Sequence, residues 1–588
     1  MPNPKLTLAH VTHEAVEQIG GIGTVLEGLM ISPAYQKRVG RSILVGPTQV
    51  DPAADPRQRL GASGEVLYSS VDKIDTVDLG VKLRPIEWAF STPIVYGRRR
   101  FNNHGEQRSG EAEVLLIDVH NITAPRLAVF KHRLWEHYGL DSSPYEQHWD
   151  YEEYTRLAEP AFYALLALLG DDTQPCILFS HEFMGMPTVL QAMLEAPGRF
   201  RSIFHAHECA TARRLVEDHP GHDTMFYNVL RQAREKGQFV EDVFGSMKHF
   251  FRHELVSRAH RCDAVIAVGD YTRDELKFLS ADFNKKDVDL VYNGVPAMAV
   301  DLPAKLRSRN MLLGYAKALV GYEPDVLMTH VTRPVISKGL WRDLKVCHEI
   351  EPFLTAKGKT AVLFMLTTGG GVRSREQVRR MEKQYGWPRE HREGHPDLVG
   401  PEVNIYRDVD AFNKGHQRIQ VVLVNQFGWE RDRIGERLPA EMTIADLRRA
   451  TDVEFGMATY EPFGISPLEP LGSGAVCVIS NVCGCKGFVD HVTKGRHTPC
   501  VLEADFTQLD RPRTIDQLKR MTRPERDRIE QAVAAEVAAR LWRAVPKTDN
   551  QRQRLITSGQ TLVARMGWDQ VIENKLWPVL QRVAAIRR

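Results

Sequence analysis

Two carboxylates, Glu461 and Glu469, occur in the glycine- and proline-rich stretch TYEPFGISPLEPLGSG (459–474). Ser466 and Glu469 fit the Ser-x-x-Glu capping box, which predicts a helix beginning here and explains Glu469 without any ligand. Glu461 falls outside that pattern. It lies in a turn next to Gly464, where the missing side chain lets a ligand approach the backbone closely. The stretch therefore predicts a ligand-facing carboxylate at Glu461 and leaves two interpretations for Glu469.

Two cations, Arg333 and Lys338, lie in VTRPVISKGLW (331–341), directly after a strand-like run. Positive charges at a strand end can neutralise a diphosphate leaving group, on which charge develops as its bond breaks. The alternative is a surface loop with two solvated charges. Both interpretations stay open on these residues alone.

Three glycines, Gly20, Gly21 and Gly23, follow the first strand-like run and precede an apolar helical pattern that begins at Val25. A glycine-rich turn before a helix presents backbone N–H groups and the positive end of the helix dipole to a phosphate. A plain tight turn is the alternative. The dinucleotide pattern G-x-G-x-x-G fails, because Leu26 occupies its third glycine position counted from Gly21.

Histidines cluster after two first-half strands: His181 follows one, and His205, His207 and Cys209 alternate in RSIFHAHECATARRL (201–215). Alternation on a strand puts three such ligands in a line on one face, and the set has no clear fourth member. We therefore expect no metal site. A structural histidine is the alternative to a functional role for His181.

These residues follow a regular succession of apolar runs and helical patterns. Runs rich in β-branched residues predict two series of strands, at 6–11, 42–46, 114–119, 176–180, 201–207 and 264–269 and at 326–332, 361–368, 419–426, 453–459 and 475–480. Helical patterns such as 151–170 separate them, which predicts largely parallel sheets and an α/β fold. Two doubly wound domains would bind a ligand in a cleft between them, at the carboxyl ends of the strands.

The length of 588 residues predicts two domains. The two strand series place the first at residues 1–295 and the second at residues 296–565, with a helical insertion at about 371–417. Residues 566–588 predict a C-terminal helix.

Composition excludes several classes of partner. The net charge of +2, from 77 basic and 75 acidic residues, gives no basic field for nucleic acid. No uncharged apolar run of about 18 residues appears, so we expect no membrane span. The eight scattered cysteines indicate reduced thiols, and the N-terminus lacks the pattern of a signal peptide. We therefore expect a cytoplasmic protein.

Taken together, the motifs resemble those of the retaining GT-B glycosyltransferases, most closely the glycogen synthases of the animal and fungal type. The similar segments, in the family's order from about residue 6 to about residue 490, are GGIGTVL (20–26), LVGP (44–47), His181 to Phe183, His207 to Arg213, HRCDAVIAVGDYTRDEL (260–276), VYNGV (291–295), Arg333 with Lys338, and Glu461 with Glu469. The order and the spacings make the resemblance specific.

The chain departs from the family at several positions. The family's lysine before the first glycine pair is Gln18, and the tryptophan of its Glu-Pro-Trp-Gly motif is Phe463. The 371–417 insertion is shorter than the one through which the family's enzymes assemble, so a homo-oligomer stays open. The family's arginine-rich regulatory helix is not recognisable in the tail.

The resemblance implies two domains of the GT-B type facing an interdomain cleft, and the transfer of glucose from a nucleotide sugar, UDP-glucose by preference, to the non-reducing end of an α-1,4-glucan with retention. No cofactor and no metal are implied. The implied catalytic residues are Glu461, His181, Arg333 and Lys338, and the implied donor-binding residues are Gly20, Gly21, Gly23, Glu469, Phe463, Gly464, His207 and Arg213.

Other functions stay open beside this one. A small-sugar acceptor would give a sucrose- or trehalose-type product. A catalytically inactive glucan-binding protein is favoured by Gln18 and opposed by the intact cations and glutamates. A dinucleotide-dependent oxidoreductase is disfavoured, since the glycine pattern fails.

Overall fold

The chain forms two compact units, each with its own sheet. The computed structural model describes residues 5–16, 20–103, 108–171, 174–296 and 300–587. Unit 1 consists of Met1–Thr211, Arg234–Gly294 and Trp568–Arg588, and unit 2 consists of Ala212–Ala233 and Val295–Gly567. The chain thus passes from one unit to the other after Thr211, Ala233, Gly294 and Gly567. The predicted domains differ from this division, because an apolar pattern does not tell which sheet a distant helix packs against.

Unit 1 is built on a ten-stranded sheet in the order β10-β9-β8-β7-β1-β2-β6-β5-β3-β4. The strands are β1 (Leu6–Val11), β2 (Val39–Thr48), β3 (Gly64–Ser69), β4 (Ile74–Asp75), β5 (Ile94–Asn103), β6 (Arg108–Asp118), β7 (Cys176–His181), β8 (Phe200–Ala206), β9 (Ala264–Ala267) and β10 (Val288–Leu290). From β10 to β6 all pairs are parallel, and β5, β3 and β4 add antiparallel pairs at one edge. Every residue of β7 and β8 is buried, as expected for strands covered on both faces.

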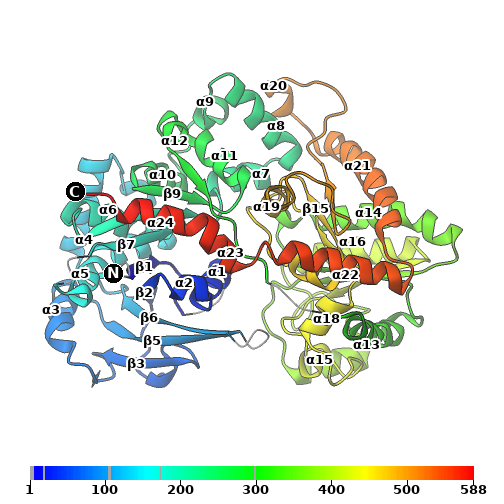
Figure 1. Ribbon diagram of the computed structural model, residues 1–588, viewed down its shortest axis with the longest axis horizontal. Coiled ribbons are helices and arrows are strands. Elements are labelled where there is room, and N and C mark those ends of the chain that lie inside the picture. The colour runs from blue at the N-terminus through cyan, green and yellow to red at the C-terminus, as the bar shows by residue number, and fades with distance from the viewer. Residues whose placement is uncertain (1–4, 17–19, 104–107, 172–173, 297–299, 588) are drawn as a thin grey trace. The chain divides into compact units, whose positions relative to one another are not determined.

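Helices cover this sheet. They are α1 (Gly21–Met30), α2 (Pro33–Gln36), α3 (Gly80–Phe90), α4 (Ala124–Tyr138), α5 (Trp149–Leu169), α6 (Met186–Glu195), α9 (Val240–Phe244), α10 (Phe251–Ser257), α11 (Asp270–Leu279), α12 (Ala281–Lys285), α23 (Trp568–Val571) and α24 (Trp577–Ala584). The red helix α24 lies along β7 and β8 although it is far from them in sequence (Figure 1). The guanidinium of Arg201 in β8 donates to the carbonyl oxygen of Ile586, which fixes the end of this segment to the sheet.

Unit 2 has a six-stranded, entirely parallel sheet in the order β13-β12-β11-β14-β15-β16. The strands are β11 (Val326–Val331), β12 (Ala361–Leu366), β13 (Ile419–Val424), β14 (Val453–Gly456), β15 (Val476–Ser480) and β16 (Val501–Ala504). The helices are α13 (Leu302–Val320), α14 (Leu340–Ala356), α15 (Arg375–Tyr385), α16 (Pro401–Gly415), α17 (Arg431–Ile434), α18 (Ile444–Ala450), α19 (Gly484–Thr493), α20 (Ile515–Leu518), α21 (Arg523–Ala544) and α22 (Asp549–Val563). Buried aromatic side chains, among them Tyr315, Phe364 and Trp429, form part of the core around β12.

Two helices, α7 (Ala210–Asp218) and α8 (His222–Glu235), contain the first two crossings between the units. The predicted boundaries place the segment between these crossings, Ala212–Ala233, in the first domain, whereas the structure groups it with unit 2. Within the described ranges, no helix combines the length and the apolar character needed to cross a bilayer.

Candidate active site

Lys338 and Glu461 meet at the carboxyl end of the unit 2 sheet. Lys338 ends a short 3₁₀ helix (Ile336–Lys338) that follows β11, and Glu461 follows the neighbouring strand β14. The ammonium group of Lys338 donates to Oε2 of Glu461, and each side chain keeps 14% of its surface exposed. The backbone N–H of Thr459 donates to the carbonyl oxygen of Ser337 at 2.7 Å and joins the two loops. The two charges are therefore paired, held by the backbone and accessible to solvent.

Gly464 fixes the conformation of the loop that carries Glu461. Its φ of +86° lies in the left-handed region, which favours glycine. A Cβ atom added there would lie 2.8 Å from Sγ of Cys483 and 2.9 Å from Cγ of Glu461. Phe463 is buried, and its carbonyl oxygen accepts a 2.7 Å hydrogen bond from the N–H of Cys485. A side chain at position 464 would displace Cys483, Glu461 or both.

The predicted capping box at Ser466 and Glu469 is wrong. Residues Ser466–Ser473 form a 3₁₀ helix whose N-cap is Ile465, and no side chain caps it. The hydroxyl of Ser466 instead donates to the carbonyl oxygen of Val331 at 2.8 Å. The spacing of Ser466 and Glu469 could not reveal that the hydroxyl of Ser466 would bond to Val331, the last residue of β11.

Glu469 is paired with Arg448 of α18 at 2.7 Å and stays 37% exposed. Arg448 also contacts the buried Glu454 at 2.8 Å, so it links the strand β14 to Glu469. Sequence reasoning missed Arg448, because an arginine in a charged helical pattern gives no signal of its own. Arg333 is exposed, and within the described parts of the chain no ion pair holds its guanidinium.

A buried charge network contacts the backbone of the loop that leads to Glu461. Arg342 of α14 is fully buried, contacts Asp223 at 2.6 Å and Glu530 at 2.9 Å, and donates to the carbonyl oxygens of Met457 and Ala458 at 3.2 Å. Burial raises the pKa of Asp223 against the attraction of Arg342. Burial would also raise the pKa of Glu530, but Arg342 and its neighbours lower it to about 2. The network connects three helices to the loop before Glu461.

In unit 1 the glycines expected to face a phosphate form the start of α1. Gly20 is its N-cap and the helix begins at Gly21, earlier than the predicted start at Val25. The N–H of Gly23 donates to Oε2 of Glu14 at 2.6 Å. Burial raises the pKa of Glu14, and hydrogen bonds from His13 and from the backbone of Gly23 and Gly20 lower it further than burial raises it. The helix N-terminus thus binds an anion, a carboxylate of the chain itself.

A cavity of about 250 Å³ lies beside this helix start and is lined by Glu14, Gly23, Leu26, Glu27, Ser63, Arg99, Arg100, Phe101 and Asn102. Gln18, at the position of the family's lysine, lies outside the described residues.

His181 and His207 form a hydrogen-bonded pair at the ends of β7 and β8. Nδ1 of His181 lies 2.8 Å from Nε2 of His207, and Nε2 of His181 lies 3.0 Å from Nδ1 of His10. His181 is fully buried and His207 is partly exposed. Burial lowers the pKa of His207 and of His10 to about 3, and with the neighbouring histidines it lowers that of His181. The rings are therefore neutral at pH 7.

Arg213 lies in α7, in the segment that belongs to unit 2, and its Nε donates to Oε1 of Glu217 at 3.0 Å. The structure thus brings together Lys338 with Glu461, and His181 with His207. Glu469 is paired with Arg448, and Arg213 is paired with Glu217; neither partner was predicted.

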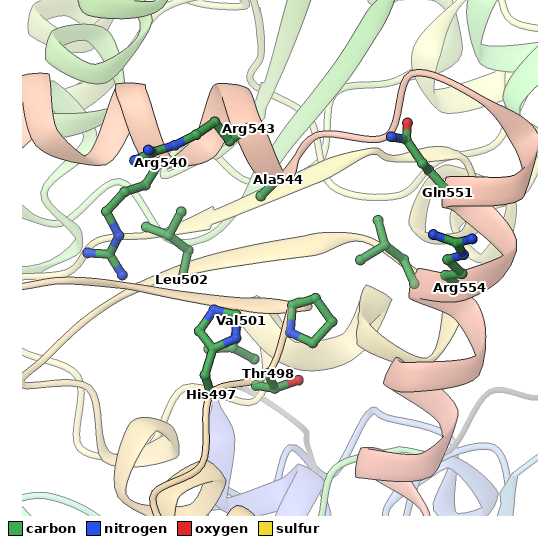
Figure 2. Close-up of a pocket in the computed structure, with 11 residues that line it drawn as sticks. His497, Thr498, Val501, Leu502, Arg540, Arg543, Ala544, Gln551 and Arg554 are labelled. Carbon is green, nitrogen blue, oxygen red and sulfur yellow. The ribbon is translucent and has the colours of Figure 1, made fainter.

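A cavity of about 510 Å³ lies elsewhere in unit 2. Figure 2 shows Arg540 and Arg543 of α21 on one side and Gln551 and Arg554 of α22 on the other, with His497 and Leu502 below. None of the residues predicted for the active site lines it.

Comparison with known proteins gives a fold. No family model and no curated protein matches the sequence. Among solved structures, the catalytic domain of starch synthase IV from Arabidopsis thaliana, bound to ADP and acarbose, matches with a TM-score of 0.53 at 16% identity over 99% of this chain and 100% of that one. The chain has the GT-B fold.

Two further GT-B structures match to a similar degree. Trehalose-phosphate synthase from E. coli, bound with UDP-2-fluoro glucose, gives a TM-score of 0.50 at 11% identity over 99% of both chains. Sucrose-phosphate synthase from Thermosynechococcus elongatus gives a TM-score of 0.50 at 14% identity over 99% of this chain and 100% of that one. At these identities the likeness concerns the GT-B fold and its two sheets.

Proposed function

We propose that this chain is a retaining glycosyltransferase that moves glucose from a nucleotide sugar, UDP-glucose by preference, to the non-reducing end of an α-1,4-glucan. The observation that carries the proposal is the pair of Lys338 and Glu461 at the carboxyl end of a parallel sheet with the GT-B fold. Ligands of open α/β sheets bind at this end of the strands. Solved structures of the same fold include a starch synthase bound to ADP and acarbose.

Lys338 and Arg333 would neutralise the departing nucleoside diphosphate. Negative charge grows on the diphosphate as the glycosidic bond breaks, and fixed cations stabilise that charge. Lys338 is held by Glu461 and Arg333 is exposed, so both can contact a phosphate entering from solvent. No bound ion is needed for this step.

Glu461 would lie beside the donor glucose ring, with Phe463 and Gly464 shaping its loop. Glu469 would meet the ribose hydroxyls, since it remains partly exposed while Arg448 orients it. A carboxylate that is oriented by an arginine and still reaches solvent is suited to accept hydroxyl hydrogen bonds.

Unit 1 would contribute the start of α1 and the histidines. Gly20, Gly21 and Gly23 offer the helix N-terminus to a phosphate or a sugar hydroxyl, in competition with Glu14. His207 is accessible and can touch the sugar, whereas His181 is buried and bonded through both ring nitrogens. We therefore propose that His181 orients His207 through their hydrogen bond. We also propose that Arg213 contacts the sugar or the phosphate.

The test is release of UDP or ADP from the two glucose donors, measured with and without glycogen. We expect release from UDP-glucose that glycogen stimulates. Products are then separated by size: a ladder indicates a glucan acceptor, and a single disaccharide indicates a small sugar acceptor. No release from either donor under any acceptor condition contradicts a glycosyltransferase.

A further inference from the structure

Four histidines meet at the carboxyl ends of three neighbouring strands of unit 1. His10 lies in β1, His181 ends β7, His205 lies in β8, and His207 follows it. In the parallel register His181 is paired with His205. Because side chains alternate along a strand, His205 and His207 point to the same face. The alternation in 201–215 concerns one strand, whereas the structure adds His181 from the strand beside it.

His205 has no hydrogen-bond partner among the described residues. It is 4% exposed, and both Nδ1 and Nε2 are buried and unpaired. Its ring centroid lies 4.0 Å from that of His207 and 5.3 Å from that of His181. A neutral imidazole has one donor and one acceptor nitrogen, and both lose their water when the ring is buried. The ring of His205 therefore lies beside the rings of His181 and His207, and neither of its nitrogens has a hydrogen-bond partner among the described residues.

The spacing suits a single ion. One nitrogen from each of His181, His205 and His207 lies within 4.8 Å of the other two. Nitrogens bound to one tetrahedral zinc ion at about 2.0–2.1 Å lie roughly 3.3 Å from each other. Nδ1 of His181 and Nε2 of His207 face each other at 2.8 Å, so they need to open slightly while His205 rotates inward.

The surroundings supply the outer contacts that histidine ligands usually have. A metal-bound histidine donates its other N–H to a fixed acceptor. If Nδ1 of His181 binds the ion, its Nε2 donates to Nδ1 of His10, and Nε2 of His10 in turn donates to the hydroxyl of Tyr35. Glu182 holds the backbone beside the third ligand, since its Oε1 accepts from the N–H groups of His207 and Glu208.

We propose that His181, His205 and His207 bind one divalent transition-metal ion of the zinc class, with the fourth position left to water or a ligand. Imidazole is a preferred ligand of zinc, copper and nickel, and three histidines with one open position are an established coordination set. The proposal does not depend on the proposed glucosyl transfer, because it concerns binding alone.

The test uses the full chain, with any affinity tag removed, after dialysis against a chelator and then against chelator-free buffer. Co²⁺ is titrated while the visible absorption of four-coordinate cobalt is followed, and Zn²⁺ is titrated by calorimetry. We expect one equivalent to bind. We also expect Zn²⁺ to raise the melting temperature, since a ligand of the native state stabilises it.

The decisive variant is His205→Asn, which removes a proposed ligand that makes no hydrogen bond. We expect at least a tenfold loss of Co²⁺ and Zn²⁺ affinity, with an unchanged far-ultraviolet circular dichroism spectrum. The matched control is His416→Asn, which breaks the pair of the exposed His348 and the partly buried His416 in unit 2, whose nitrogens lie 2.9 Å apart. It should leave affinity unchanged.

Absence of a one-equivalent transition in the wild-type protein overturns the proposal and leaves the ring of His205 to a water molecule. Binding that survives in His205→Asn and disappears in His416→Asn also overturns it, and assigns the ion to the pair of His348 and His416. If His205→Asn does not fold, the wild-type stoichiometry, cobalt spectrum and melting shift still decide.

Discussion

Among single residues, Glu461 carries the most specific prediction. Glu461→Gln keeps the shape of the side chain but removes the charge that pairs with Lys338. We expect glucosyl transfer to fall by several orders of magnitude, because in the proposed function this charge lies preorganised beside the reacting ring. Removal of one such group typically costs about 10²–10³-fold or more. The measurement is the initial rate of UDP release. Glu441→Gln, at an exposed position, should behave as wild type, and near-normal turnover of Glu461→Gln would disprove the role.

Gly464 gives a second prediction about a single residue. Gly464→Ala places a Cβ in a left-handed backbone and against Cys483 and Glu461. We expect transfer to fall about 10²-fold, since a small misplacement of a catalytic group has that effect. Gly371→Ala is a matched control: its φ of +75° is similar, but nothing lies within 4 Å of the added atom. Both variants should lose about 1–2 kcal/mol from backbone strain. Equal rates in the two variants would show that the contact with Glu461 has no effect.

Between elements, Arg342 is the residue that joins α14, α21 and the start of α8. Arg342→Met leaves Asp223 buried without its cation, while Glu530 loses one partner and keeps Lys345 at 2.9 Å. Breaking a buried ion pair in this way costs about 3–5 kcal/mol, and we expect that loss in the unfolding free energy of unit 2. Urea denaturation at pH 7 measures it.

The loss should shrink as the pH falls, because the carboxylate of Asp223, left without its cation, takes up a proton and becomes neutral. Arg523→Met is the control, since this arginine on α21 is 77% exposed and its partner Asp527 lies 3.6 Å away. It should change stability by less than about 0.5 kcal/mol. A similar effect of both substitutions would contradict a structural role for the buried network.

How far the sequence predicts the elements depends on what covers them. All eleven predicted strands form, because strands buried on both faces are continuous apolar runs. The strands β3, β4 and β5 were not predicted. They lie at the antiparallel edge of the unit 1 sheet, and β5 contains the charged run Arg98–Arg100. The strands β10 and β16 were missed as well, because they lie at sheet edges and are only partly buried, so they do not form a continuous apolar run.

The candidate site was predictable where it follows from strand ends and was not where it depends on side-chain partners. Lys338 and Glu461 meet because parallel strands end at one edge of a sheet. Arg448 pairs with Glu469, and Glu14 accepts a hydrogen bond at the helix start from Gly23. Neither pair follows a residue spacing that is typical of a known motif. The roles of His181, Arg213 and the glycines stay predictions.

At the scale of the whole molecule, acid stability depends on buried neutral histidines such as His253. Burial lowers its pKa to about 4, and its Nδ1 lies 3.0 Å from the hydroxyl of Thr211. A histidine in the unfolded chain takes up a proton near pH 6.5. Between these two values the unfolded chain binds the extra proton, so stability falls as the pH falls.

We expect His253→Asn to reduce the slope of unfolding free energy against pH between 6 and 4.5 by about 1.4 kcal/mol per pH unit, the value for one proton. Urea denaturation of unit 1 at several pH values measures the slope. The exposed His137→Asn should leave it unchanged. An unaltered slope in His253→Asn would mean that this histidine takes up its proton in the folded state as well.

The four passages of the chain between the units have a consequence for biosynthesis. Unit 2 needs Ala212–Ala233, which are synthesised before its first strand, and unit 1 needs Trp568–Arg588, which are synthesised after unit 2. Domains of most proteins fold in order as they leave the ribosome. Here α24 can pack on β7 and β8 only after more than 360 further residues have been translated, counting from Ala206 to Trp577. The growing chain would therefore expose the apolar sheet surface that α24 covers throughout the synthesis of unit 2, and a nascent chain stalled at Gly567 would be a substrate for chaperones.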